Sequence, residues 1–426
     1  MSMLTTLNER QIHYAELLIR TGVNLQPGQS LRLGAELAHA DFVRIVAAAA
    51  YQAGARYVHV DWNDTPLQRA RFQYSQPGDL DFFPEYEVQR HRQMVDERWA
   101  RLALVGPEFP DLLSDVDPGA MRRVSQVRIQ KLRFYMQAQM ANQLQWCVAA
   151  VPTPAWAQKV FPHLGAVEAV ARLWDVILHT VRADLPDPVA AWRRHDEQLQ
   201  RVTQFLAHHQ VQSLHFFDPT PGPDGKPASD LHVGLTDHSL WLAASSLTPE
   251  GIRFLPNMPT EEVFSAPHNQ RTTGYVRTSR PCFPLERRVE GAYFRFEAGE
   301  IVAYDAEVGR DVLEQFFAIR GARRLGEIAL VDVRSPVHQS GLVFFETLFD
   351  ENAACHMAFG EAYPECIAGG TERSEEEMAA LGFNYADTHL DVMIGTPTMN
   401  LTGYTYDDQD VLIMRAGRFV IPGLMD

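Results

Sequence analysis

The first sixty residues alternate between helical and strand-like spacing of their apolar positions. In residues 9–21 apolar side chains recur three or four positions apart, which predicts an amphipathic helix that ends at Gly22. Short alternating segments at residues 30–33 and 56–62 predict strands, and residues 41–52 between them predict a helix. A helix between strands of these lengths favours a parallel sheet in a layered α/β domain.

Two further segments of the first half, residues 102–105 and 145–151, predict more strands of the same sheet. No glycine-rich phosphate loop follows the early strands, which argues against a dinucleotide site there. The sequence DLPDP at 184–188 places two prolines ahead of a long polar helix. We therefore expect an N-terminal α/β domain with a layered, mostly parallel sheet over residues 1–186 and a second domain over 187–426.

The pattern changes after this boundary. Residues 212–347 are rich in strand-like segments with frequent glycine and proline turns, and residues 219–227 predict a surface loop or hairpin tip. The segment 291–307 reads as two alternating strands around Ala298 and Gly299, which predicts a hairpin. The second domain is accordingly expected to be a strand-rich α+β domain.

The composition of the chain argues against several classes of protein. The 426 residues include 38 Lys and Arg against 54 Asp and Glu, a formal net charge of -16, which argues against nucleic-acid binding because that requires a basic face. The acidic surface instead favours cationic or amine-bearing substrates. Four scattered cysteines, no apolar run of about 20 residues and no apolar signal core predict a soluble cytoplasmic protein with reduced thiols and no membrane association.

Carboxylate side chains in the second half are the first candidates for chemistry. Glu261 and Glu262 follow a proline turn, and on an extended chain only one of them faces a given site. A capping threonine with acidic first-turn residues explains this segment without a metal, and is the commoner situation. Glu327 opens an apolar strand, where a buried carboxylate needs a partner. For this residue an ion pair with Arg323 or Arg324 and a metal-ligating role are equally open.

A second group of candidates follows within a short segment. His356 lies five positions after Glu351, so a turn or short helix can bring the two together, although the spacing alone does not decide it. The neighbouring Cys355 is better explained as a buried structural thiol than as a nucleophile, because adjacent side chains diverge on a strand or helix. Tyr363 has no local feature that separates it from a packing residue.

The strongest local signal is the pair His389 and Asp391. An alternating strand places both on one face, where they either bind a metal or form a hydrogen-bonded pair. Carboxylates and imidazoles without thiolates suit Zn²⁺, Co²⁺ or Mn²⁺. A set of about four carboxylates and two histidines is more than one tetrahedral ion uses, and it fits two divalent ions that share a bridging carboxylate.

Several segments, in order along nearly the whole chain, resemble the thermophilic aminopeptidases of the aminopeptidase T and aminopeptidase S type. They read YAELLIRTGVNLQPGQ, VPTPAWAQKVFP, NMPTEEVF, GARRLGEIALV, LFDENAACHMAFG with a following AY, and THLDVMIG. The resemblance implies six metal ligands: Glu261, Glu327, Glu351, His356, His389 and Asp391. It implies that Glu327 bridges the ions, places Tyr363 at the site, and makes Glu262 a neighbour that does not bind metal. Glu262 and Glu351 are then the candidates for the general base.

The resemblance implies a metal-dependent aminopeptidase. In this hypothesis two divalent ions in the C-terminal domain activate a water that attacks the first carbonyl of a peptide with a free N-terminus, and Tyr363 donates a hydrogen bond to the oxyanion. It also implies a cytoplasmic homodimer. From the ligand types alone two other interpretations stay open: a dinuclear metal amidohydrolase or phosphoesterase, and a non-enzymatic protein with a structural metal.

Overall fold

The fold is described from a computed structural model, for residues 6–110, 112–113, 115–407 and 409–424. These residues form two compact units. The N-terminal unit comprises the chain up to Arg193 together with Ser245–Pro259, and the C-terminal unit comprises Arg194–Ala244 and the chain from Thr260 onwards. The single domain boundary expected after residue 186 stays a prediction, and the structure adds that residues 245–259 return to the N-terminal unit.

A five-stranded sheet forms the centre of the N-terminal unit, with the strand order β10-β4-β3-β1-β2 and parallel pairing throughout. Its strands are β1 (Ser30–Glu36), β2 (Tyr57–Asn63), β3 (Ala100–Val105), β4 (Trp146–Ala150) and β10 (Asn257–Met258). The predicted α/β domain with a parallel sheet is thereby confirmed. The sequence predicted four of these strands, and β10 enters from a distant segment beside β4.

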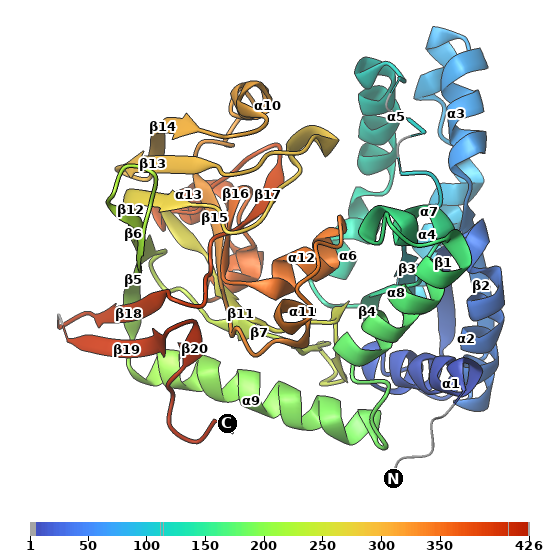
Figure 1. Ribbon diagram of the computed structural model, residues 1–426. Coiled ribbons are helices and arrows are strands. Elements are labelled where there is room, and N and C mark those ends of the chain that lie inside the picture. Colours follow the sequence, from blue (N-terminus) through green and yellow to red (C-terminus); the bar gives the residue numbers. More distant parts are fainter. Residues whose placement is uncertain (1–5, 111, 114, 408, 425–426) are drawn as a thin grey trace. The chain divides into compact units, whose positions relative to one another are not determined.

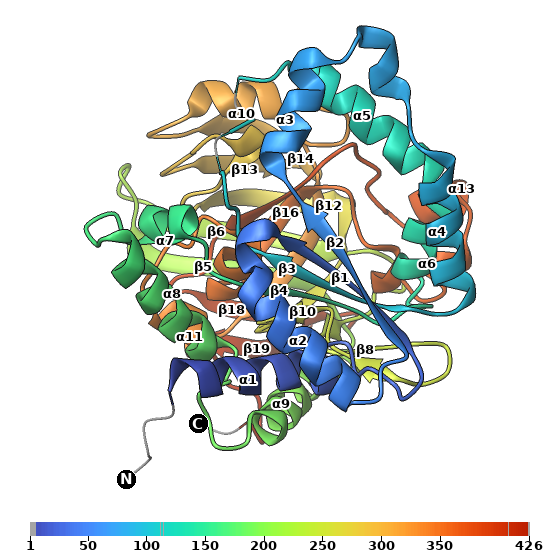
Figure 2. The same cartoon turned by 90° about the vertical axis from the view of Figure 1, so that its right-hand side faces the viewer.

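Helices surround this sheet. They are α1 (Leu7–Leu17), which a π-helical segment continues over Leu18–Gly22, α2 (Ala40–Gln52), α3 (Thr65–Tyr74), α4 (Glu85–Asp96), α5 (Pro118–Lys131), α6 (Arg133–Met140), α7 (Pro154–Val160) and α8 (Ala166–Thr180). Thr6 and Glu9 form a capping box at the start of α1. Figure 2 shows α1 and α2 in front of the sheet, and Leu31, Leu33 and Leu102 on its strands are fully buried.

Two antiparallel sheets make up most of the C-terminal unit. The larger has the order β14-β13-β12-β6-β5-β18-β19-β20. Its strands are β5 (Val211–Pro221), β6 (Pro227–Leu235), β12 (Pro267–Arg277), β13 (Tyr293–Glu297), β14 (Glu300–Asp305), β18 (Asn400–Thr405), β19 (Asp410–Arg415) and β20 (Arg418–Phe419). Figure 1 shows β5 and β6 in green beside β18 in red, although these segments lie far apart in the sequence. The predicted hairpin is β13–β14, and the predicted loop at 219–227 is the tip of β5–β6.

The smaller sheet has the order β17-β16-β15-β11-β7. Its strands are β7 (Leu242–Ala243), β11 (Glu262–Ser265), β15 (Leu325–Val331), β16 (His356–Gly360) and β17 (His389–Met393). Phe359 on β16 is fully buried, and its ring centroid lies 4.9 Å from that of Phe294 on the larger sheet. The two sheets of the unit therefore pack against each other through these aromatic side chains. The two antiparallel sheets confirm the predicted strand-rich C-terminal domain.

The remaining elements are short, apart from α9 (Pro188–His208). They are β8 (Ser246–Leu247), β9 (Arg253–Phe254), α10 (Arg310–Phe316), α11 (Pro336–Gln339), α12 (Thr347–Asp350) and α13 (Glu375–Ala380). No helix in the described part of the chain is both long and apolar enough to cross a membrane.

Candidate metal centre

Strand register places five of the candidate side chains on one face of the five-stranded antiparallel sheet. Residues paired across neighbouring strands point to the same face, as do alternate residues along a strand. Glu327 on β15 pairs with Ala358 on β16, which in turn pairs with Asp391 on β17. Alternation along the strands and pairing between them place three further side chains on this face. They are Glu262 on β11, His356 on β16 and His389 on β17.

The ligand-type atoms converge into two groups that have Glu327 in common. In the first group, His356 Nε2 lies 3.2 Å from Glu262 Oε2 and 4.0 Å from Glu327 Oε1. In the second, His389 Nε2 lies 3.3 Å from Glu327 Oε2 and 3.4 Å from Asp391 Oδ1. In each group the three ligand atoms lie within 4.8 Å of one another. The two oxygens of Glu327 therefore face different histidines, which is the arrangement that a bridging carboxylate needs.

Backbone carbonyls set the ring orientation of both histidines. His389 Nδ1 lies 2.8 Å from the carbonyl oxygen of Glu361, and His356 Nδ1 lies 3.1 Å from that of Ala354. A carbonyl oxygen only accepts hydrogen bonds, so Nδ1 of each ring carries the proton. Nε2 of the neutral ring is then the atom with a free lone pair, and it points into the cluster. This is how outer hydrogen bonds orient metal-binding histidines.

The negative charge of the buried carboxylates in the cluster must be neutralised by bound cations or protons. Glu262, Glu327 and His356 are all buried. Burial raises the pKa of Glu327, and the nearby carboxylates of Glu262 and Asp391 raise it further, against the opposing effect of the hydrogen bond from His389. Burial alone would lower the pKa of His356, but Glu262 and the other carboxylates outweigh it and raise this pKa to about 9. Without a cation His356 therefore keeps its second proton at neutral pH, so binding of a divalent cation displaces that proton and becomes stronger as the pH rises.

The donor set fits divalent cations. Glu262 Oε2 is buried, and His356 Nε2 approaches it at 3.2 Å. When His356 is neutral with its proton on Nδ1, Nε2 donates nothing to this buried oxygen, and a cation in the cluster would remove the cost of leaving it without a donor. Carboxylate oxygens with imidazole nitrogens are ligands that Zn²⁺, Co²⁺ and Mn²⁺ accept.

The side chains of Glu261 and Glu262 point to different sides, as expected on an extended chain. The resemblance implies that Glu261 binds metal and Glu262 does not, whereas the geometry favours Glu262. Glu261 Oε2 lies 3.5 Å from Nε2 of His195 on α9, which also lies 2.8 Å from the carbonyl oxygen of Thr260. Glu262 begins β11 and lies beside His356. Ligation by Glu261 stays a prediction, and Glu262 is the member of the pair that the structure brings to the cluster.

Glu351 and Tyr363 border the cluster. Burial raises the pKa of Glu351 well above its usual value, and the carboxylates of Asp391, Glu262 and Glu327 raise it further. The Tyr363 hydroxyl lies 3.5 Å from His389 Nε2. Burial, followed by the same carboxylates, raises the pKa of Tyr363 well above its usual value. The hydroxyl therefore stays protonated and is able to donate a hydrogen bond.

Sequence reasoning missed Asn352, whose side chain links the backbone just before Glu262 to the segment that carries Glu351. Its side chain is fully buried, and Oδ1 accepts a hydrogen bond of 2.6 Å from the backbone N–H of Glu261. Nδ2 donates to the carbonyl oxygen of Leu348 at 2.9 Å. An amide beside Glu351 in the DENA segment is the only signal that the sequence offered.

Cys355 has a structural environment. All four cysteines are free and buried, as their scattered positions predict. Cys355 Sγ lies 3.3 Å from the backbone nitrogen and 3.4 Å from the carbonyl oxygen of Val331. Burial raises the pKa of this thiol to about 12, so the reactive thiolate is absent at neutral pH.

Comparison with known proteins identifies the family of this chain, and the matches cover nearly its full length. The model of a family described as thermophilic metalloprotease (M29) matches residues 7–419. Aminopeptidase T of Thermus aquaticus is 40% identical over 96% of this chain and 97% of its own length, and Aminopeptidase 2 of Geobacillus stearothermophilus is 39% identical over 95% and 96%. The structure titled wild-type AmpT from Thermus thermophilus matches with a TM-score of 0.89 at 37% identity, covering 98% of this chain and 100% of that one. The resemblance predicted from the sequence segments is confirmed.

Proposed function

The chain belongs to the thermophilic metalloprotease family (M29), and on this premise we propose that it is a metal-dependent aminopeptidase that acts on peptides with a free N-terminus. Its relatives are named aminopeptidases, at 33 to 40% identity over most of the chain. The observation that carries the proposal is the cluster of carboxylate oxygens and imidazole Nε2 atoms around Glu327. A hydrolase of this kind needs such a cluster to polarise an amide carbonyl.

We assign the cluster to two divalent ions, with Zn²⁺, Co²⁺ or Mn²⁺ as candidates. Glu262, Glu327 and His356 would hold one ion, and Glu327, His389 and Asp391 would hold the other. The distances within the two groups support this division, and they are the reason for assigning Glu262 rather than Glu261. Glu351 is a further ligand or the general base.

The side chains around the ions have separate tasks in peptide hydrolysis. Bound divalent ions supply Lewis acidity to the carbonyl and lower the pKa of the attacking water. Glu351, as a carboxylate next to the cluster, accepts the proton of that water. The Tyr363 hydroxyl donates a hydrogen bond to the oxygen that becomes negative. The excess of carboxylates attracts the α-amino group of the peptide.

The proposal extends to assembly and compartment. The resemblance implies a cytoplasmic homodimer, and four buried free thiols suit a reducing compartment. Sedimentation equilibrium of the metal-loaded protein measures the oligomeric state, and a monomer at micromolar concentration contradicts that part of the proposal alone.

Hydrolysis of leucine p-nitroanilide tests the main proposal. We expect a chelator to abolish the activity, and added Zn²⁺, Co²⁺ or Mn²⁺ to restore it. His389→Ala removes one ligand and should reduce kcat/KM by more than about a hundredfold. Glu376→Gln, at an exposed position on α13, is the matched control and should leave kcat/KM unchanged.

Substrate controls separate aminopeptidase activity from its alternatives. N-acetyl-leucine p-nitroanilide lacks the free amino group, and p-nitrophenyl phosphate tests for a phosphoesterase. An aminopeptidase hydrolyses neither at a significant rate. Equal hydrolysis of the acetylated substrate indicates a general amidohydrolase, and hydrolysis of the phosphate ester alone indicates a phosphoesterase; both results contradict the proposal.

A further inference from the structure

A second set of ligand-type side chains lies on the larger antiparallel sheet. His215 on β5 and His232 on β6 are direct cross-strand partners, and Asp230 lies two positions before His232 on the same face. One ligand atom from each of the three residues lies within 4.8 Å of the others. This His215–Asp230–His232 cluster shares no residue with the candidate metal centre, which lies on the smaller sheet.

The two imidazoles are held against each other. Their ring centroids are 3.9 Å apart with an interplanar angle of 8°. His215 Nε2 lies 2.8 Å from Asp230 Oδ1, and His232 Nε2 lies 4.0 Å from the same oxygen. Tyr404 on β18 stacks beside His232, with ring centroids 6.2 Å apart. Both Nε2 atoms therefore approach one carboxylate oxygen from neighbouring strands.

We propose that the His215–Asp230–His232 cluster binds a transition metal ion, with Zn²⁺ as the main candidate. Two imidazole nitrogens and one carboxylate oxygen are ligands that Zn²⁺ uses, and three protein ligands leave one position of a tetrahedral ion for water. Binding replaces the hydrogen bond between His215 and Asp230. His215 Nε2 loses its proton to water while Nδ1 takes one up, so the ring stays neutral, and Nε2 and Asp230 Oδ1 move apart from their separation of 2.8 Å to bind the ion.

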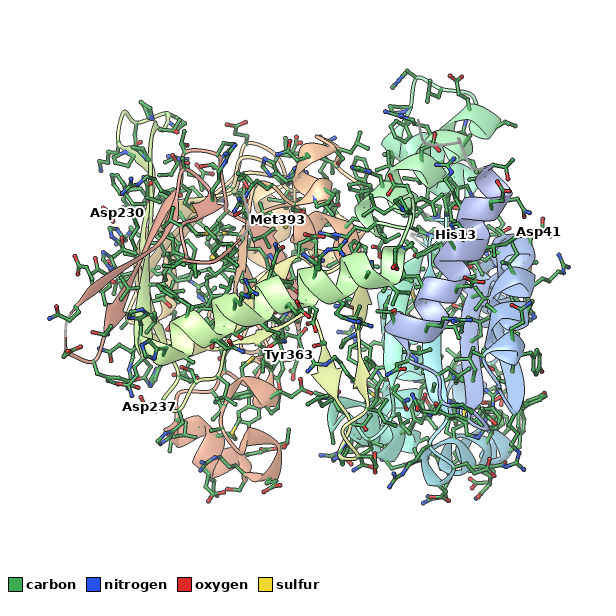
Figure 3. The ribbon with its side chains drawn as sticks, turned by 90° about the horizontal axis from the view of Figure 1, so that it is seen from below. His13, Asp41, Asp230, Asp237, Tyr363 and Met393 are labelled. Carbon is green, nitrogen blue, oxygen red and sulfur yellow. The ribbon has the colours of Figure 1, made fainter. Side chains whose placement is uncertain are left out.

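The site is accessible from solvent and separate from the proposed catalytic cluster. The side chains of His232 and Asp230 are 48% and 44% exposed, so an ion can enter without opening the core. Figure 3 labels Asp230 at the outer edge of the C-terminal unit, away from Tyr363. An ion bound here joins β5 to β6 without touching Glu327 or its neighbours, so its removal should leave hydrolysis intact.

Zinc binding to the metal-loaded protein tests the inference. A chromophoric chelator in competition measures how many Zn²⁺ ions the protein holds beyond those of the catalytic cluster. The unmodified protein should bind one additional ion, and His232→Gln should weaken this binding by at least about tenfold. His179→Ala is the matched control, because His179 pairs with Asp184 at 2.9 Å and no three-ligand group among the described residues includes it.

Leucine p-nitroanilide hydrolysis, measured in parallel, keeps this inference distinguishable from the proposed function. We expect His232→Gln to hydrolyse the substrate at the rate of the unmodified protein. Equal additional zinc in His232→Gln and the unmodified protein overturns the inference while leaving the peptidase proposal intact. Loss of the additional ion together with the hydrolytic activity overturns the claim that this site is separate.

A second measurement does not depend on any variant. Anomalous diffraction at the zinc edge, from crystals of the unmodified protein exposed to Zn²⁺, should give a peak among His215, Asp230 and His232. Absence of a peak there overturns the inference. A peak without an additional ion in the solution experiment indicates binding at crystal concentration only and also overturns it.

Discussion

Substitution of Asn352 by alanine tests whether a buried amide, rather than a charged ligand, positions the metal-binding side chains. Asn352 accepts a hydrogen bond from the backbone N–H of Glu261 and donates one to the carbonyl oxygen of Leu348. The first bond holds the segment that leads directly into Glu262. Asn352→Ala removes both bonds without changing any candidate metal ligand.

The magnitude follows from the burial of these groups. A buried N–H that loses its acceptor costs about 1–3 kcal/mol, and the lost bond to the carbonyl oxygen of Leu348 adds about 0.5–1.5 kcal/mol. We therefore expect Asn352→Ala to reduce the free energy of unfolding by about 2–4 kcal/mol. Displacement of Glu262 by a fraction of an ångström should also reduce kcat by about tenfold or more, because catalytic geometry tolerates little displacement.

Urea denaturation followed by circular dichroism measures the first effect, and leucine p-nitroanilide hydrolysis at saturating metal measures the second. Asn8→Ala, at an exposed position in the first turn of α1, is the control and should change the free energy of unfolding by less than about 0.5 kcal/mol. If Asn352→Ala also stays within about 0.5 kcal/mol and keeps full kcat, the positioning role assigned to Asn352 is refuted.

Three further predictions concern separate parts of the molecule. The zinc affinity of the candidate metal centre should rise from about pH 6 to about pH 9, because the pKa of His356 is raised to about 9 and its proton must leave before the ion binds. Calorimetry in buffers of different ionisation enthalpy measures the released protons. An affinity that does not change with pH contradicts this prediction. Asp61→Ala should destabilise the protein by about 2 kcal/mol, because Arg32 loses its counter-charge, whereas Arg90, also 2.6 Å from Asp61, keeps its ion pair with Glu87; a loss below about 0.5 kcal/mol in urea denaturation argues against it. Cys355→Ala should keep more than about half of the hydrolytic rate, since this thiol stays protonated; a hundredfold loss in a folded variant would restore the nucleophile hypothesis.

The spacing of apolar residues along the sequence was sufficient to predict most strands of the N-terminal sheet. The alternating residues 30–33 lie in β1, the predicted strand at 56–62 overlaps β2 from Tyr57 onwards, and the helix predicted at 41–52 lies in α2. These elements are predictable because burial of one face imposes a period of two or 3.6 residues on nearby positions. The dipeptide strand β10 carries no such period, and only its pairing with β4 defines it.

The candidate site was predictable in part. The alternation of His389 and Asp391 on one strand is a local property, and it placed the pair on a shared face before any fold was known. Which of Glu261 and Glu262 joins them depends on where β11 begins and on its register with β15, and both are set by contacts between distant segments. Asn352 was missed for the same reason, since its hydrogen bond to Glu261 joins residues far apart in the chain.

The number of metal ions bound at the candidate metal centre tests the dinuclear assignment without intermediates, provided that the His215–Asp230–His232 cluster is removed from the count. His232→Gln therefore serves as the background, alone and combined with His389→Ala or Glu327→Gln. Because the two oxygens of Glu327 face His356 and His389 separately, we expect two ions in the background protein and one after His389→Ala. We expect Glu327→Gln to weaken binding of both ions and to abolish hydrolysis. Inductively coupled plasma mass spectrometry of the dialysed proteins gives these ratios. A single ion in the background protein, or two ions and full hydrolysis after Glu327→Gln, would contradict a dinuclear centre bridged by Glu327.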